Sequence, residues 1–182
     1  MSVFTNPSNS TPRQIAEYVA ALLDLVGDTD PLTILRDTPT ALARATAGVP
    51  DALLRQPESP GKWSVAQVLQ HLADSEVVWA WRLRLVLAQD RPQLTGYDQD
   101  LWAARLGYEL ANPSEAIEEF SIVRRANLRL LDRATPEDLQ RVGVHSERGE
   151  ESLGHLRRLY AGHDLLHLRQ IDRILTAVRR GG

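Results

Sequence analysis

Two histidines of this chain have the spacing of metal ligands. His163 and His167 are four residues apart, in a segment where inward-facing residues recur every three or four positions. On an α-helix this spacing places both imidazoles on one face, one turn and roughly 6 Å apart. Two imidazoles so placed can grip one divalent ion, as they do in zinc-dependent proteases. The inward positions of the segment are Leu153, Leu156, Tyr160, His163, His167, Ile171, Ile174 and Val178.

A third ligand is expected from an earlier apolar segment, in which His71 lies beside Val68 on the inward face. Three imidazoles leave one coordination position for water or substrate, which is typical of a catalytic rather than a structural metal site. Imidazole ligands suit zinc, nickel or iron(II). The alternative is that these histidines are hydrogen-bonded core residues, since an i,i+4 pair also arises by chance. The inward positions of this segment are Val65, Val68, Leu69, Leu72, Val78, Trp79, Leu83 and Val86.

The remaining two of the five histidines are weaker candidates. His155 falls off the inward stripe and is expected at the surface near a helix start. His145 falls in a segment, 140–151, that is rich in glycine and charge and is expected to be a solvated loop.

Helix-start signals indicate which elements position these side chains. Threonine, serine, aspartate or asparagine precedes each predicted helix, often followed by proline or by a glutamine three residues later. The predicted helices are 12–26, 31–47, 64–90, 113–132 and 152–180. Segment 50–62 is expected to be a loop, and the aromatic segment 91–110 is expected to pack over one end of a bundle. No hairpin signal is visible, so a sheet is not expected.

Composition excludes several classes of function. The chain has 182 residues, 43% of them hydrophobic, which suits a single domain spanning 1–182 with an N-terminal extension of about 1–30 and a bundle of about 31–180. It has no cysteine, which excludes disulfides, thiolate ligands and a cysteine nucleophile. No apolar stretch approaches the roughly 20 residues of a membrane span. The polar segment Met1–Pro12 lacks a signal core, so we expect a cytoplasmic protein that does not associate with membranes.

Two motifs resemble those of a known family. Gly61-Lys62-Trp63-Ser64 with Val68-Leu69-Gln70-His71-Leu72-Ala73-Asp74-Ser75-Glu76, and the later segment from Tyr160 to Ile171, are similar to the signatures of the DinB-like superfamily of metalloenzymes. The resemblance spans about residues 31–178. It implies an all-α fold, an up-down-down-up four-helix bundle that is frequently dimeric. It also implies a metal-binding triad, which falls on His71, His163 and His167, and a zinc or nickel ion, with manganese or iron as further options.

The resemblance implies two reactions on a small-molecule substrate: metal-dependent hydrolysis, or S-transfer from a low-molecular-weight thiol such as bacillithiol, mycothiol or glutathione. A metal could lower the pKa of water or hold a thiol as thiolate. Asp74, three residues after His71, is the candidate catalytic residue, with a role in orienting a histidine or a surface position as alternatives. Glu76 and Asp164 are expected to be surface residues or salt-bridge partners. Tyr160 could line a pocket but is expected to be a core aromatic.

Two alternatives belong to other classes of function. One is a non-catalytic, metal-stabilised bundle that serves in stress response or binds a ligand. The other is a nucleic-acid binder using the arginines and tryptophans between residues 79 and 91. Nearby aspartates dilute that patch, the net charge is −3, and no groove-reading motif is present, so no nucleic-acid partner is expected. The apolar surface of 12–26 and 91–110 predicts a homodimer.

Overall fold

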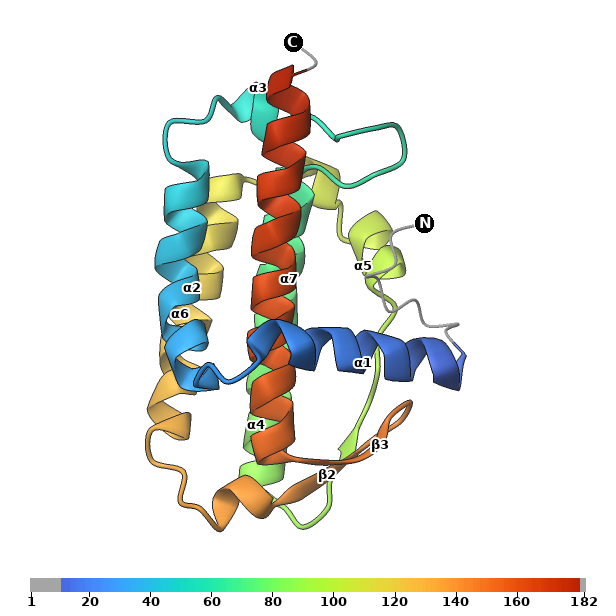
Figure 1. Ribbon diagram of the computed structural model, residues 1–182, viewed down its shortest axis with the longest axis vertical. Coiled ribbons are helices and arrows are strands. Elements are labelled where there is room, and N and C mark those ends of the chain that lie inside the picture. Colours follow the sequence, from blue (N-terminus) through green and yellow to red (C-terminus); the bar gives the residue numbers. More distant parts are fainter. Residues whose placement is uncertain (1–10, 181–182) are drawn as a thin grey trace.

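The architecture is a bundle of four long helices in a computed structural model, which describes residues 11–180. In Figure 1 the first and last of them run upward and the middle two run downward, the up-down-down-up order that the resemblance implies. Their predicted ends agree closely with the observed ones. The bundle helices are α2 (Pro31–Thr46), α4 (Val65–Ala88), α6 (Pro113–Leu131) and α7 (Leu153–Arg180).

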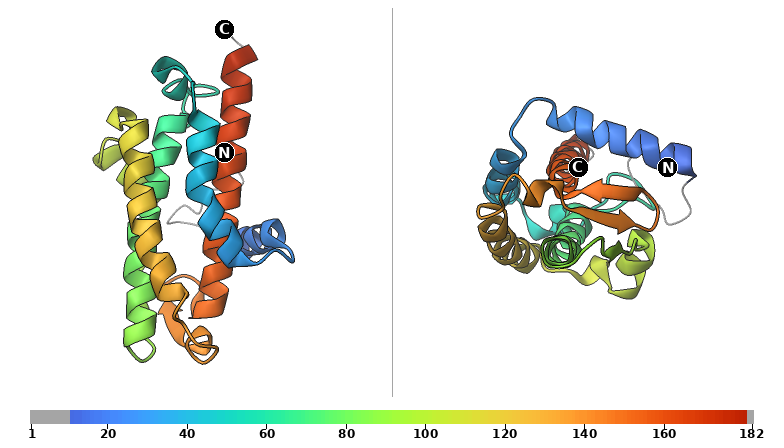
Figure 2. Two further views of the ribbon diagram at one scale, coloured as in Figure 1. Left: turned by 90° about the vertical axis from the view of Figure 1, so that its left-hand side faces the viewer. Right: turned by 90° about the horizontal axis from the view of Figure 1, so that it is seen from below.

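The predicted caps begin these helices. Ser64 and Gln67 form a reciprocal capping box at the start of α4, and Asp30 and Asn112 accept backbone N–H groups at the starts of α2 and α6. The same capping box, made by Thr11, begins α1 (Pro12–Val26), an additional helix that lies across α7 (Figures 1 and 2). Local chemistry therefore determines where α1, α2, α4 and α6 start.

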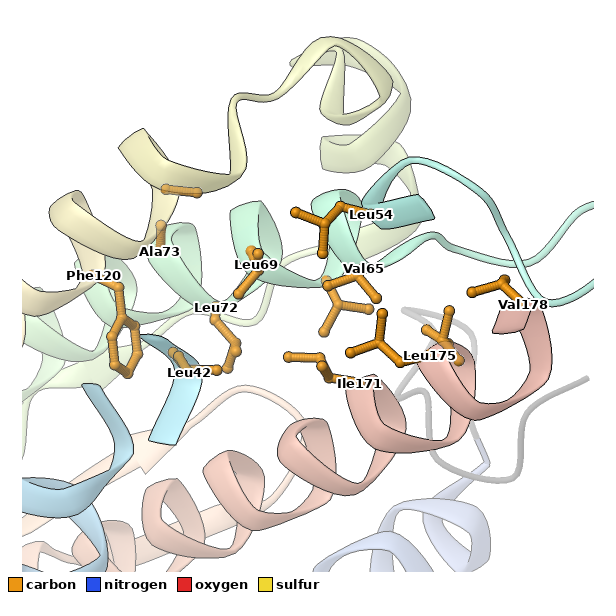
Figure 3. Close-up of a cluster of buried hydrophobic side chains, with 13 residues drawn as sticks. Leu42, Leu54, Val65, Leu69, Leu72, Ala73, Phe120, Ile171, Leu175 and Val178 are labelled. Carbon is orange, nitrogen blue, oxygen red and sulfur yellow. The ribbon is translucent and has the colours of Figure 1, made fainter. Parts of the chain in front are cut away.

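Apolar side chains from all four bundle helices meet between them. Figure 3 shows one such cluster, in which Leu42 of α2, Phe120 of α6 and Ile171 of α7 approach Leu69 and Leu72 of α4. These side chains are at most 1% exposed. Burying a leucine or phenylalanine side chain contributes about 1.5–3 kcal/mol, so this cluster does not depend on a metal for its stability.

A buried ionic network also joins the four helices. The guanidinium of Arg124 on α6 donates to Glu76 on α4, to Asp164 on α7 and to the Leu35 carbonyl on α2. Asn127 donates a further hydrogen bond, of 2.8 Å, to Glu76. Glu76 and Asp164 each form a salt bridge with Arg124, which is one of the two roles expected for them. Both residues are only 1% exposed, so they are not surface residues.

The predicted all-α bundle is confirmed, but a small sheet accompanies it. The expectations of no sheet and of a plain loop at 140–151 are therefore wrong. The hairpin signal was missed because its turn is not a two-residue Asn-Gly type: residues 146–148 connect the strands and Gly149 follows with a φ of 78°. The strands are too short for the sequence to show a clear alternation of apolar and polar residues. They are β1 (Gln93–Leu94), β2 (Val142–His145) and β3 (Gly149–Ser152), with β1 parallel and β3 antiparallel to the central β2.

The two other irregular segments also contain short helices. Segment 50–62 includes α3 (Asp51–Leu54), and segment 91–110 includes β1, α5 (Gln99–Arg105) and the 3₁₀ helix Tyr108–Leu110. A further 3₁₀ helix, Asp138–Gln140, precedes β2. Segment 91–110 runs along α4 instead of covering one end of the bundle (Figure 1), because Tyr108 is buried against that helix.

Two expectations concern surfaces and the N-terminus. Within residues 11–180, no helix is long and apolar enough to cross a membrane. Trp79 and Arg82 are buried, so they do not form an exposed basic surface with Trp81. The prediction about Met1–Pro12 rests on residues that lie almost wholly outside the part described.

Candidate metal centre

The three predicted ligands meet inside the bundle. The Nε2 atom of His163 lies 3.2 Å from Nε2 of His71 and 3.1 Å from Nε2 of His167. One ligand atom from each of the three lies within 4.8 Å of the others. His71 comes from α4 and the other two come from α7, so the fold joins residues 92 positions apart along the chain.

The separations of 3.2 and 3.1 Å between Nε2 of His163 and the other two Nε2 atoms fit ligation of one metal ion. Zinc–nitrogen bonds of about 2.0–2.1 Å place neighbouring imidazole nitrogens roughly 3.0–3.4 Å apart in tetrahedral or octahedral geometry. The Nδ1 atom of His167 lies 2.7 Å from the amide oxygen of Gln170. If this nitrogen carries the ring proton of the neutral imidazole, the lone pair of Nε2 faces the other two histidines. Three nitrogens facing one another is an arrangement that a cation would stabilise.

Burial keeps the three imidazoles in the form that binds metal. It lowers the pKa of His167 to about 4, and it lowers the pKa values of His71 and His163 well below the usual value. The neighbouring histidines lower the pKa values of His71 and His163 further. At neutral pH each imidazole is therefore uncharged and has a free lone pair, as metal ligation requires.

A pocket opens on one side of the triad. Its walls come from α1, α4, α7, the segment after β1 and the hairpin β2–β3, and it has a cavity volume of about 90 Å³. His71 and His163 line it. Since a water needs about 10–15 Å³ by this measure, the cavity has room for several waters or for part of a small molecule.

A pair of hydroxyl groups lies beside the triad in the lining of the pocket. The Ser75 hydroxyl is 3.4 Å from Nε2 of His71 and 2.8 Å from the Tyr97 hydroxyl. Burial raises the pKa of Tyr97 to about 12, so it stays protonated and can donate or accept a hydrogen bond. Sequence reasoning assigned no role to either residue. Ser75 follows His71 by one helical turn, and that spacing was the signal available.

The candidate catalytic residue Asp74 takes another position. Its carboxylate accepts hydrogen bonds from the hydroxyl of Tyr108 and the amide of Gln70. It is not among the residues that line the pocket. Tyr160, expected to be mainly a core aromatic, stacks on Trp79 with ring centroids 4.1 Å apart and also lines the pocket.

The two histidines outside the triad differ from each other. The side chain of His155 is partly exposed, close to its predicted surface position. His145 was expected in a solvated loop, but it lies on β2, is 2% exposed and lines the pocket. The difference arises because β2 pairs with a strand on each side and is covered on the bundle side.

Comparison with known families agrees with this geometry. A family model described as the DinB superfamily matches residues 34–171, most of the chain and all three histidines. The chain belongs to the DinB superfamily. The resemblance seen in the sequence motifs is thereby confirmed.

Related members of the DinB superfamily come from bacilli. A protein of Oceanobacillus iheyensis, named as a candidate metal-dependent hydrolase, is 31% identical over 140 residues, covering 75% of this chain and 79% of the relative. A Geobacillus thermodenitrificans protein of the same description is 30% identical over 175 residues, covering 94% and 89%. The solved structure of YfiT from Bacillus subtilis, described as a candidate metal-dependent hydrolase with an unusual four-helix bundle topology, covers 93% of both chains with a TM-score of 0.72 at 23% identity. The chain described here therefore shares the bundle fold of YfiT.

Proposed function

We propose that this protein binds one divalent metal ion through His71, His163 and His167 and uses it to catalyse hydrolysis of a small molecule. The observation that carries the proposal is the convergence of three Nε2 atoms beside a cavity, two from the buried residues His71 and His167 and one from the partly buried His163. The names of the relatives from Oceanobacillus and Geobacillus support hydrolysis as the reaction. Zinc or nickel is the expected ion, with manganese and iron as alternatives.

A bound divalent ion would supply Lewis acidity, which lowers the pKa of water or of a thiol. The protein's own part is positional. Gln170 orients His167, and the hydroxyls of Ser75 and Tyr97 stand where they can hydrogen-bond to a reactant beside the triad. The triad provides only three protein ligands, which leaves a coordination position for that reactant.

The enclosed position of the site favours small substrates over polymers. α1 and the hairpin β2–β3 form walls of the pocket, and residues from both contribute to its lining. Excluding water strengthens electrostatic interactions within such a site. A second reaction, S-transfer from a low-molecular-weight thiol, would need a thiol co-substrate because the chain has no cysteine.

The test begins with metal analysis of purified protein, followed by assays with zinc-, nickel- and manganese-loaded samples. The panel contains esters and amides, and electrophiles with bacillithiol, mycothiol or glutathione. Hydrolysis that is lost in the variant with all three histidines changed to alanine would support the proposal. Turnover only with a thiol would replace hydrolysis by S-transfer. Metal-replete protein with no turnover above the triple variant would favour a non-catalytic, ligand-binding bundle.

A further inference from the structure

Arg82 of α4 is a buried cation without a carboxylate partner. Its guanidinium donates to the Tyr160 hydroxyl at 3.1 Å and to the Thr95 carbonyl at 2.6 Å, and its Nε atom is buried with no hydrogen-bond partner. The residue is 6% exposed. Among the ion pairs of residues 11–180, none includes Arg82. A buried charge without a counter-charge is costly, so its presence needs an explanation.

The buried Arg124 and the largely buried Arg148 show that this arrangement is not general in the described part of the protein. Arg124 has two carboxylate partners, Glu76 and Asp164, and Arg148 has Glu151 at 2.6 Å. The residues outside the described part, 1–10 and 181–182, include no Asp or Glu. Within residues 11–180, no carboxylate forms an ion pair with Arg82, so its positive charge is available to a bound anion.

Two further buried donors without partners belong to the same pocket. They are Nε2 of Gln99 and Nε2 of His145. The backbone N–H of Glu147 donates to Nδ1 of His145 at 3.2 Å, so the proton of the neutral ring is on Nε2. Burial lowers the pKa of His145 to about 3, with help from Arg148 and Arg82, and this keeps the ring neutral. Buried nitrogens without partners are rare in folded proteins, and here four belong to residues that line one cavity: these three and Nδ1 of the triad residue His71.

The residues that carry these donors line the same cavity as two histidines of the triad. Tyr160 connects them, because its hydroxyl accepts from Arg82 and its ring centroid lies 6.5 Å from that of His163. His71 and His163 line the same cavity as Arg82, Gln99 and His145. One small molecule can therefore contact both groups at once.

We propose that Arg82, Gln99 and His145 bind an oxyanion group of the substrate, a carboxylate or a phosphate, while the reactive part of the same molecule lies at the triad. A guanidinium with amide and imidazole N–H donors is well suited to a group with two or three anionic oxygens. The second half of this inference rests on the proposed function. Oxyanion binding itself does not, because none of its three donors is a triad histidine.

Glu147 is the acidic residue among those that line the pocket. Its backbone N–H donates to Nδ1 of His145, so Glu147 is part of the turn that holds that ring.

The probes are acetate and inorganic phosphate, titrated at pH 7.5 in an otherwise chloride-only buffer and followed by ¹H–¹⁵N NMR. The metal-free protein and the variant with all three triad histidines changed to alanine are both expected to bind at least one probe. Arg82→Gln should weaken binding at least tenfold and Arg82→Lys less. The matched control is Arg141→Gln, because Arg141 also donates to backbone carbonyls near the end of α4 but does not line the pocket. It should bind as the unchanged protein does.

The relative affinities of the two probes decide between carboxylate and phosphate. Should Arg82→Gln fail to fold, His145→Gln and Gln99→Leu replace it, each expected to weaken binding at least threefold. Unchanged affinity in all the folded pocket variants, or no binding of either probe to the unchanged protein, would overturn the inference. Oxyanion binding by a metal-replete protein that shows no turnover above the triple-histidine variant would instead count against the proposed reaction alone.

Discussion

A Cβ atom placed on Gly162 would lie 2.3 Å from the carbonyl oxygen of Leu22. Gly162 precedes the triad residue His163 on α7, and Leu22 is a buried residue of α1 that lines the pocket. The missing side chain therefore lets the backbone of α1 approach α7 beside the triad and form one wall of the cavity.

Gly162→Ala is expected to displace α1 and to lower the free energy of unfolding by about 1–3 kcal/mol, as overpacking does. The gain in helix propensity, about 1 kcal/mol, is too small to offset the contact with backbone atoms. Gly154→Ala on the same helix is the matched control, because its added Cβ would be 3.3 Å from the nearest atom. Urea unfolding followed by circular dichroism gives both values, and a Gly162→Ala variant more stable than its parent would refute the close approach.

Changing any one triad histidine to alanine is expected to abolish stoichiometric metal binding and to leave a folded bundle. Two imidazoles bind a divalent ion far more weakly than three, and the apolar clusters remain complete without the ion. His155→Ala and His145→Ala should keep their full metal content, since neither contributes to the triad. Elemental analysis together with far-ultraviolet circular dichroism checks both points. Full metal content in His163→Ala would mean that other residues bind the ion.

The triad could be predicted because its information is local. The spacing of His163 and His167 and the apolar neighbours of His71 each lie within one helix, and a helix converts spacing into direction. The rest of the pocket could not be predicted in this way. His145 and Arg82 meet through the pairing of β1 with β2, a contact between short strands about 50 residues apart, and strands of two and four residues carry almost no periodic signal.

The buried charges show a similar limit. Glu76 and Asp164 look like solvent-facing carboxylates in their own helices, and only the position of Arg124 on a third helix explains their burial. A charged residue inside a bundle is recognised from its partner, which sequence spacing does not reveal.

We propose that the chain forms a homodimer. The structure retains part of the apolar surface on which this prediction was based: Leu101, Leu106 and Leu110 of segment 91–110 are each at least half exposed. α1 contributes no exposed large hydrophobic residue, because its apolar side packs on α7. Multi-angle light scattering at micromolar concentration should give twice the 20.3 kDa chain mass, and a monomer mass would remove the proposal.

Arg124→Ala is expected to lower the free energy of unfolding by about 3–5 kcal/mol, because it leaves the carboxylates of Glu76 and Asp164 buried without a counter-charge. Arg36→Ala provides the contrast. Arg36 and Asp132 form an ion pair whose side chains are nearly half exposed, so its loss should cost less than about 1 kcal/mol. Equal effects of the two substitutions in urea unfolding would show that the buried network does not hold the helices together.

The last prediction concerns acid sensitivity, which His145 should increase. Burial lowers the pKa of its imidazole to about 3 in the folded chain, compared with about 6.5 in the unfolded chain. Between these two pH values the His145 ring binds a proton in the unfolded chain but not in the folded chain. Protonation of His145 therefore does not lower the free energy of unfolding above pH 6.5, and lowers it progressively as the pH drops toward 3. At pH 5 the loss from this one residue is about 1–2 kcal/mol.

We expect His145→Gln to lose less stability than the unchanged protein between pH 8 and pH 5, when both are measured metal-free by urea unfolding. The triad histidines titrate in both proteins, so their contribution cancels in the difference. His155→Gln, at a partly exposed position, should keep the acid sensitivity of the unchanged protein. Equal losses of stability in His145→Gln and the unchanged protein would mean that the His145 ring takes up a proton in the folded state. Its assignment as a buried neutral donor in the pocket would then fail.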